Sequence, residues 1–116
     1  MNQLRTTEAI VLAEATSALE REQDRSTDNL LRTAMKATYH HWMVTDEDVQ
    51  FRMAVGAVLL VAPEEDREIL TGELKSLQIL SAIMSGVPVD IASVKIPEKS
   101  FGIMKMWHQV KQIEPD

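Results

Sequence analysis

Two histidines followed by three acids are the one short stretch of this sequence with several metal-ligand side chains. His40 and His41 precede the run Asp46-Glu47-Asp48. Adjacent residues of a helix point about 100° apart, so the two imidazoles are poorly placed to bind the same ion. The sequence also lacks an H-E-x-x-H motif and the paired E-x-x-H motifs of di-iron bundles. We therefore expect histidines near a helix end and no metal, with a small metal-binding helical bundle as the weaker alternative.

Isolated polar residues could also act as acids or nucleophiles. Glu73 falls within an apolar arc of its predicted helix, where burial can tune a carboxylic acid, although such residues more often lie at the rim of a core. Ser76 shares this arc without a histidine close in sequence to activate its hydroxyl. His108, next to Trp107, is expected on the surface. No Gly-rich phosphate-binding loop is present. The sequence therefore predicts no enzyme, no catalytic residue and no cofactor.

Composition limits the class of partner. The chain has 116 residues, which predicts a single helical domain over 1–116. Its formal net charge is −6, and its 12 Lys and Arg residues are spread along the sequence, which argues against direct nucleic-acid binding. The absence of cysteine excludes disulfides and thiolate metal sites.

Neither a membrane span nor a secretion signal is expected. The longest apolar run, 53–62, is about half of the ~20 residues needed to cross a bilayer. The first ten residues show no basic segment followed by an apolar one. We expect a soluble, cytoplasmic protein without membrane contact.

Helical periodicity dominates the chain. Apolar residues recur three and four positions apart, and Gly and Pro fall mostly at the ends of these segments. The predicted helices cover 7–24, 28–44, 46–62, 64–85 and 100–113. The stretch 87–97 has Pro88 and Pro97 near its two ends and is predicted to be a short extended segment. The fold class is therefore all-α: a small bundle of four to five helices with one short extended segment, expected to be dimeric.

The fourth predicted helix carries more apolar surface than one neighbour can cover. Its apolar side chains span roughly 220° of the helix, against about 100° or somewhat more for a typical surface helix. Gly86 is expected to cap it in a left-handed conformation, and Pro88 prevents its continuation. We expect the surplus to be buried in a two-fold dimer. The predicted dimer interface consists of Leu74, Leu77, Leu80, Ile83 and Met84.

Large apolar side chains in other helices are candidates for contact with a different protein. Aromatic residues and methionine are frequent at such interfaces, although core packing is their more common role. Arg52 could add a charged contact. The predicted partner interface consists of Trp42, Phe51, Arg52, Met53, Phe101, Met104 and Trp107. The sequence does not separate partner contacts from self-contacts.

The fourth helix and its stop resemble a known family. The segment LKSLQILSAIMSGVPV, with Leu74, Leu77, Leu80, Gly86 and Pro88, is similar to the C-terminal helix of TraM-type quorum-sensing anti-activators. Length, acidity and helical content are also similar to QslA-type anti-activators. The resemblance implies a small helical dimer that binds a LuxR-type transcriptional activator and prevents its dimerisation or DNA binding without catalysis. The alternative is a helical adaptor, chaperone or phage-associated protein with another client.

Overall fold

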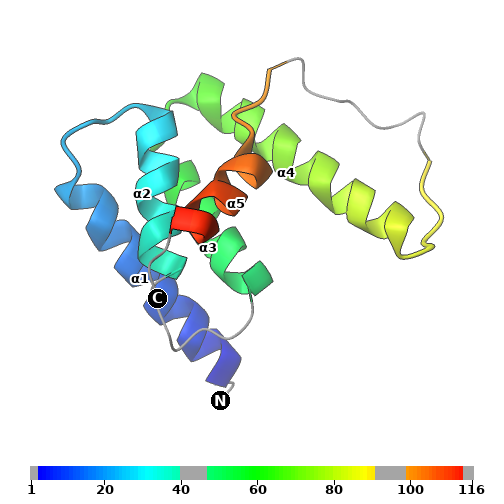
Figure 1. The fold of residues 1–116 in the computed structure, drawn as a ribbon, viewed down its shortest axis with the longest axis horizontal. Coiled ribbons are helices and arrows are strands. Elements are labelled where there is room, and N and C mark those ends of the chain that lie inside the picture. The colour runs from blue at the N-terminus through cyan, green and yellow to red at the C-terminus, as the bar shows by residue number, and fades with distance from the viewer. Residues whose placement is uncertain (1–2, 40–46, 91–98, 114–116) are drawn as a thin grey trace. The chain divides into compact units, whose positions relative to one another are not determined.

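Five helices form in the part of the chain that the structure describes, which confirms the all-α class. The structure is a computed structural model that describes residues 3–39, 47–90 and 99–113. Its helices are α1 (Gln3–Arg21), α2 (Thr27–Tyr39), α3 (Glu47–Val61), α4 (Glu64–Met84) and α5 (Ile103–Ile113) (Figure 1). Within these ranges there is no strand. The predicted extended segment falls mostly on residues 91–98, outside the described residues, and residues 87–90 have no regular secondary structure.

The described chain consists of two compact units. The first comprises residues 1–62 and 102–116, and the second comprises residues 63–101. The prediction of one domain over 1–116 stays a prediction. None of the described helices is long and apolar enough to cross a membrane.

In the first unit, α1, α2 and α3 each pack against the other two, and α5 packs against α2. Amphipathic spacing explains this arrangement, because each helix contributes one apolar face to a shared core. α3 is apolar on most sides and is accordingly buried on more than one side. The buried apolar core residues are Val11, Ala15, Leu19, Leu30, Leu31, Ala34, Met35, Val49, Phe51, Ala54, Val55, Ala57, Val58, Ala62, Ile103, Met106, Trp107 and Val110.

The turn between α1 and α2 is held by polar side chains. The Asp24 carboxylate accepts a hydrogen bond from the backbone N–H of Ser26 at 3.0 Å, which lowers the pKa of Asp24. The guanidinium of Arg25 donates to the Leu19 carbonyl oxygen near the end of α1. The Asn29 amide donates to the Asp24 carbonyl oxygen at 2.9 Å. These bonds explain why α1 ends at Arg21, three residues before the predicted end.

The second unit is built on α4, which begins and ends close to the predicted positions. Pro63 precedes it and three acids occupy its first turn, where they suit the positive end of the helix dipole. At the other end the N–H of Gly86 donates to Ile83 and the N–H of Val87 donates to Ala82, at 3.0 and 2.9 Å. Gly86 has φ +81°. This is a Schellman cap, and it confirms the predicted left-handed glycine.

Alanine substitutions at Gly86 and at Gly56 should change the stability of the fold in opposite directions. Gly86→Ala is expected to lower the free energy of unfolding by about 1 kcal/mol, because its φ is +81° and a Cβ is strained there. Gly56→Ala is expected to raise it by up to about 1 kcal/mol, because this helical glycine has open space around a new Cβ. Urea unfolding followed by circular dichroism measures both. Equal effects of the two substitutions would contradict the assignment of Gly86 as a left-handed cap.

Candidate interaction surface

One apolar stripe runs along α4 from a covered beginning to an open end. Leu70, Leu77 and Met84 are seven residues apart and therefore lie on one face of the helix. Leu70 is fully buried, Leu77 is half-buried and Met84 is 81% exposed. Leu80, on the same face, is 54% exposed. The last turns of α4 therefore present large aliphatic side chains to solvent, which marks this surface as a candidate contact site.

The open stripe continues one residue past the glycine cap. Val87 is 53% exposed, and its backbone is held against the helix end by its hydrogen bond to Ala82. Ile83 flanks the stripe and is also exposed, whereas Leu74 and Ile79 are half-buried. We call Leu77, Leu80, Met84 and Val87 the open stripe. Ile83 and Leu74 of the predicted dimer interface border it.

Charge is distributed unevenly along the same helix. Residues 64–75 contain five acids and two bases, whereas no ionisable side chain occurs between Lys75 and Asp90. The uncharged half coincides with the open stripe. Burying this half against another surface would therefore desolvate no side-chain charge, which removes the main electrostatic cost of forming a contact there.

Glu73 interrupts the apolar stripe, and its carboxylate is hydrogen-bonded to the segment that precedes α5. It is buried, and its carboxylate accepts hydrogen bonds from the Ser100 hydroxyl and from the backbone N–H of Phe101. Its two oxygens thus hold the segment 99–101 against α4. This arrangement satisfies a buried carboxylate with local donors, as the physics of burial requires. The neighbouring Ser76 donates its hydroxyl to the Gly72 carbonyl oxygen at 3.0 Å, a bond internal to the helix.

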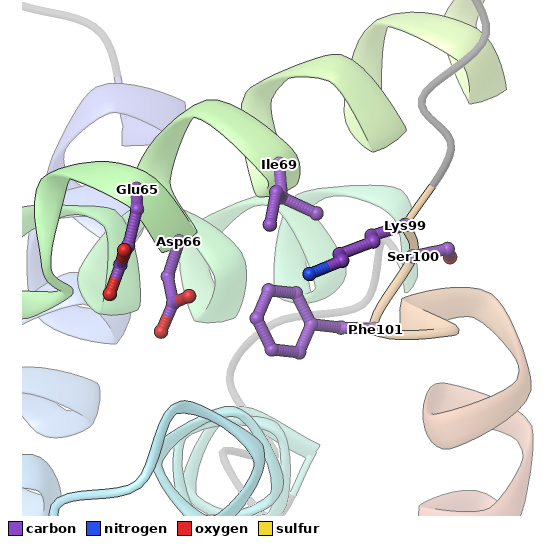
Figure 2. A pocket seen from close by; sticks show the side chains of 6 residues that line it. All are labelled: Glu65, Asp66, Ile69, Lys99, Ser100 and Phe101. Atoms are coloured by element: carbon purple, nitrogen blue, oxygen red, sulfur yellow. The ribbon is translucent and has the colours of Figure 1, made fainter.

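A surface pocket of about 580 Å³ lies beside this contact in the second unit. Figure 2 shows Glu65 and Asp66 on α4 at one side, and Lys99 and Phe101 at the other, with Ile69 between them. Carboxylates and an ammonium group thus line the same space as an aromatic ring.

Phe101 is half-buried and precedes α5, so the predicted helix start at residue 100 is three residues early. Gly102, with φ +65°, marks the actual start, where its carbonyl accepts from Met106.

Two of the predicted partner-binding residues come together inside the first unit. The rings of Phe51 and Tyr39 each meet Trp107 edge to face, with centroid distances of 5.8 Å. Trp107 is 1% exposed, and Phe51 is buried as well. Their assignment to a partner interface stays a prediction, but the structure places both side chains in the core of this unit.

The indole of Trp107 also takes part in a polar contact that the sequence does not predict. Its Nε1–H donates to Glu47 Oε1 at 2.8 Å, and the Lys111 ammonium pairs with the same oxygen. Both contacts lower the pKa of Glu47, and the contact with Lys111 has the larger effect. The available signal was the spacing of Trp107 and Lys111, which lie four residues apart on one helix face. No sequence feature paired that face with Glu47, 60 residues away.

Glu47→Gln should reduce the acid sensitivity of the fold. The pKa of Glu47 is lower in the folded state than its usual 4.5, so its contribution is complete above that value and is lost as the pH falls through the folded-state pKa. The glutamine keeps an acceptor for Trp107 but loses the ion pair. Because the Glu47 side chain is more than half exposed, we expect a loss below ~1 kcal/mol at neutral pH.

Urea unfolding of both proteins over a pH series measures this effect. The difference between wild type and Glu47→Gln should shrink as the pH drops below 4.5. Glu20→Gln makes the same charge change at an exposed position of α1 and serves as the control. A difference that is constant over the pH series would contradict the ion pair.

The other predicted partner-interface residues in the described chain, Arg52, Met53 and Met104, differ in exposure and in their contacts. Arg52 is exposed and pairs with Asp48 of its own helix at 3.0 Å. Met53 is half-buried and packs on Val11 and Val49. Met104 is exposed.

Trp42 of the predicted partner interface and the two histidines considered as metal ligands fall outside the described residues. Trp42, His40 and His41 lie within 40–46, which the structure does not describe. His108 is exposed, as expected. Within the described ranges, no group of three His, Cys, Asp or Glu residues could hold a metal ion.

One further exposed apolar pair, at the end of α3, was not predicted from the sequence. Leu60 and Val61 end α3 and are exposed. They belong to the apolar run 53–62, in which Ala54, Val55, Ala57 and Val58 are buried. No local feature of the sequence separates these two residues from the buried residues of the same run.

Comparison of this chain with protein-family models, with curated proteins and with solved structures gives no match. The resemblance of residues 74–89 to quorum-sensing anti-activators therefore stays a hypothesis.

Proposed function

We propose that this chain is a non-enzymatic cytoplasmic regulator that binds a LuxR-type quorum-sensing activator through an apolar helix face and prevents the activator from dimerising or binding DNA. The observation that carries the proposal is the open stripe of α4. Leu80 and Met84 are more than half exposed in an uncharged half-helix, which suits contact with another apolar helix. The proposal includes self-association of the chain through the same helix.

The physical mechanism is competition for an apolar surface. An activator dimer that buries a helical apolar face exposes that face when it dissociates. A chain that presents a comparable face captures the free activator subunit if the new contact is more favourable than activator self-association. The net charge of −6 would also speed encounter with a partner whose DNA-binding surface is basic.

Co-expression with a LuxR-type activator tests the proposal. We expect the activator to co-purify with this chain as a one-to-one complex of subunits and to lose binding to its DNA site in a gel-shift assay. Unchanged DNA binding in the presence of excess chain would refute the proposal. Affinity purification with mass spectrometry that recovers another client in place of an activator would favour the adaptor or chaperone alternative.

A further inference from the structure

We infer that the pocket beside Phe101 binds a linear aliphatic polyamine, a chain of methylene groups that carries ammonium groups. Its volume of about 580 Å³ lies within the range of small-molecule sites. Carboxylates, an aromatic ring and an aliphatic side chain line it together (Figure 2). This set of groups suits an alkylammonium ion, because the charge and the methylene groups of such an ion need different surroundings. The inference goes beyond the proposed function, since the pocket uses the beginning of α4 and the open stripe lies in its last turns.

The aromatic wall of the pocket is held in place by Glu73. This buried carboxylate accepts hydrogen bonds from the Ser100 hydroxyl and from the backbone N–H of Phe101. The Phe101 ring is therefore positioned before a ligand arrives, and a preformed wall loses little conformational freedom on binding. A cation that approaches the face of such a ring is attracted by the ring electrons.

Lys99 indicates which chemistry the pocket accepts. Figure 2 shows its side chain extending into the pocket between Ile69 and Phe101, with its amine pointing toward the acidic side. The methylene stem thus lies among apolar groups and the ammonium group faces carboxylates, as each end of a polyamine would. Lys99 is exposed, so its side chain can turn out into solvent when a ligand enters. Lys99 would therefore compete with the ligand from within the chain.

A second hollow extends the site far enough for more than one ammonium group. It is lined by Pro63, Glu64, Glu65 and Glu68, so the two hollows share Glu65. Four carboxylates and one ammonium group line them together. These full charges outweigh the partial positive charge of about half a unit at the beginning of a helix. A compact cation would meet the carboxylates alone, whereas a polyamine also contacts the ring and the aliphatic wall.

Titration of the purified chain with spermidine tests the inference. Two-dimensional NMR of the ¹⁵N-labelled protein should show saturable shifts of the backbone amide signals of Ile69 and Phe101. The affinity should fall as sodium chloride is added, because exposed charges are screened by salt. Absence of saturable shifts at these two residues at millimolar spermidine would overturn the inference.

Two substitutions should change the affinity in opposite directions. Lys99→Met keeps the stem and removes the competing charge, so the dissociation constant for spermidine should fall at least ~3-fold. Phe101→Leu keeps an apolar side chain and removes the ring, so the dissociation constant should rise ~2–5-fold. Lys105→Met makes the same charge change at an exposed position of α5 and is the matched control. Equal effects of Lys99→Met and Lys105→Met would contradict competition by Lys99 and overturn the inference.

Magnesium chloride separates a polyamine site from general attraction to acidic side chains. Spermidine should shift the Ile69 and Phe101 signals more than Mg²⁺ does at equal concentration of positive charge, because Mg²⁺ has no methylene groups to place against them. Equal shifts with both cations would show that the carboxylates alone are responsible and would also overturn the inference. Either result leaves the proposed function untouched, because the titration contains no activator and does not involve the open stripe.

Discussion

Trp107→Ala is expected to lower the free energy of unfolding by about 3–5 kcal/mol, the usual cost of truncating a large buried aromatic side chain. Three contacts support an effect of this size. The ring is 1% exposed and meets Tyr39 and Phe51 edge to face, and the indole N–H donates to Glu47. Edge-to-face pairs add about 0.5–1.5 kcal/mol each beyond the buried area.

Urea unfolding followed by far-UV circular dichroism measures this loss. Met104→Ala, at an exposed position of the same helix, is the matched control and should change stability by no more than about 0.5 kcal/mol. Trp107→Phe should fall between the two, because it keeps an aromatic ring but removes the donor to Glu47. A loss below ~1 kcal/mol for Trp107→Ala would show that the indole is not a core residue and would favour its predicted role as a partner contact.

The local parts of the fold were predictable from the sequence because local chemistry sets them. Pro63 and the acids after it define the start of α4, and Gly86 defines its end within a residue. The start of α5 was not predictable in this way. Ser100 and Phe101 extend the helical pattern in the sequence, but their hydrogen bonds to Glu73 hold them outside the helix, and Gly102 then begins α5.

The candidate site shows the same division between local and distant causes. The apolar face of α4 follows from periodicity, so Leu77, Leu80 and Met84 could be named from the sequence alone. Which part of that face stays open could not, because periodicity places Leu70 and Met84 on the same face, and yet Leu70 is fully buried while Met84 is 81% exposed. Trp107 was predicted as a partner contact but lies in the core, where one of its contacts is with Glu47, 60 residues away in the sequence.

The double substitution Leu80→Glu and Met84→Glu should abolish most binding to a partner that docks on the open stripe. Both side chains are more than half exposed in the free chain, so the substitutions should leave its fold and stability nearly unchanged. In a complex they would place two carboxylates in a desolvated apolar contact. Substitution of central contact residues commonly costs 2 kcal/mol or more, so we expect the dissociation constant for an activator to rise at least ~30-fold.

Isothermal titration calorimetry with a purified LuxR-type activator measures the change. Thr71→Glu and Gln78→Glu add the same two charges at exposed positions of α4 away from the stripe, so they reveal how much of the effect is general electrostatics. We expect this control to weaken binding by less than a factor of three, because exposed charges interact weakly in water. If both double variants weakened binding equally, net charge rather than the stripe would govern recognition. If neither variant weakened it, the activator would dock elsewhere, and exposed Met104 on α5 would become the next position to test.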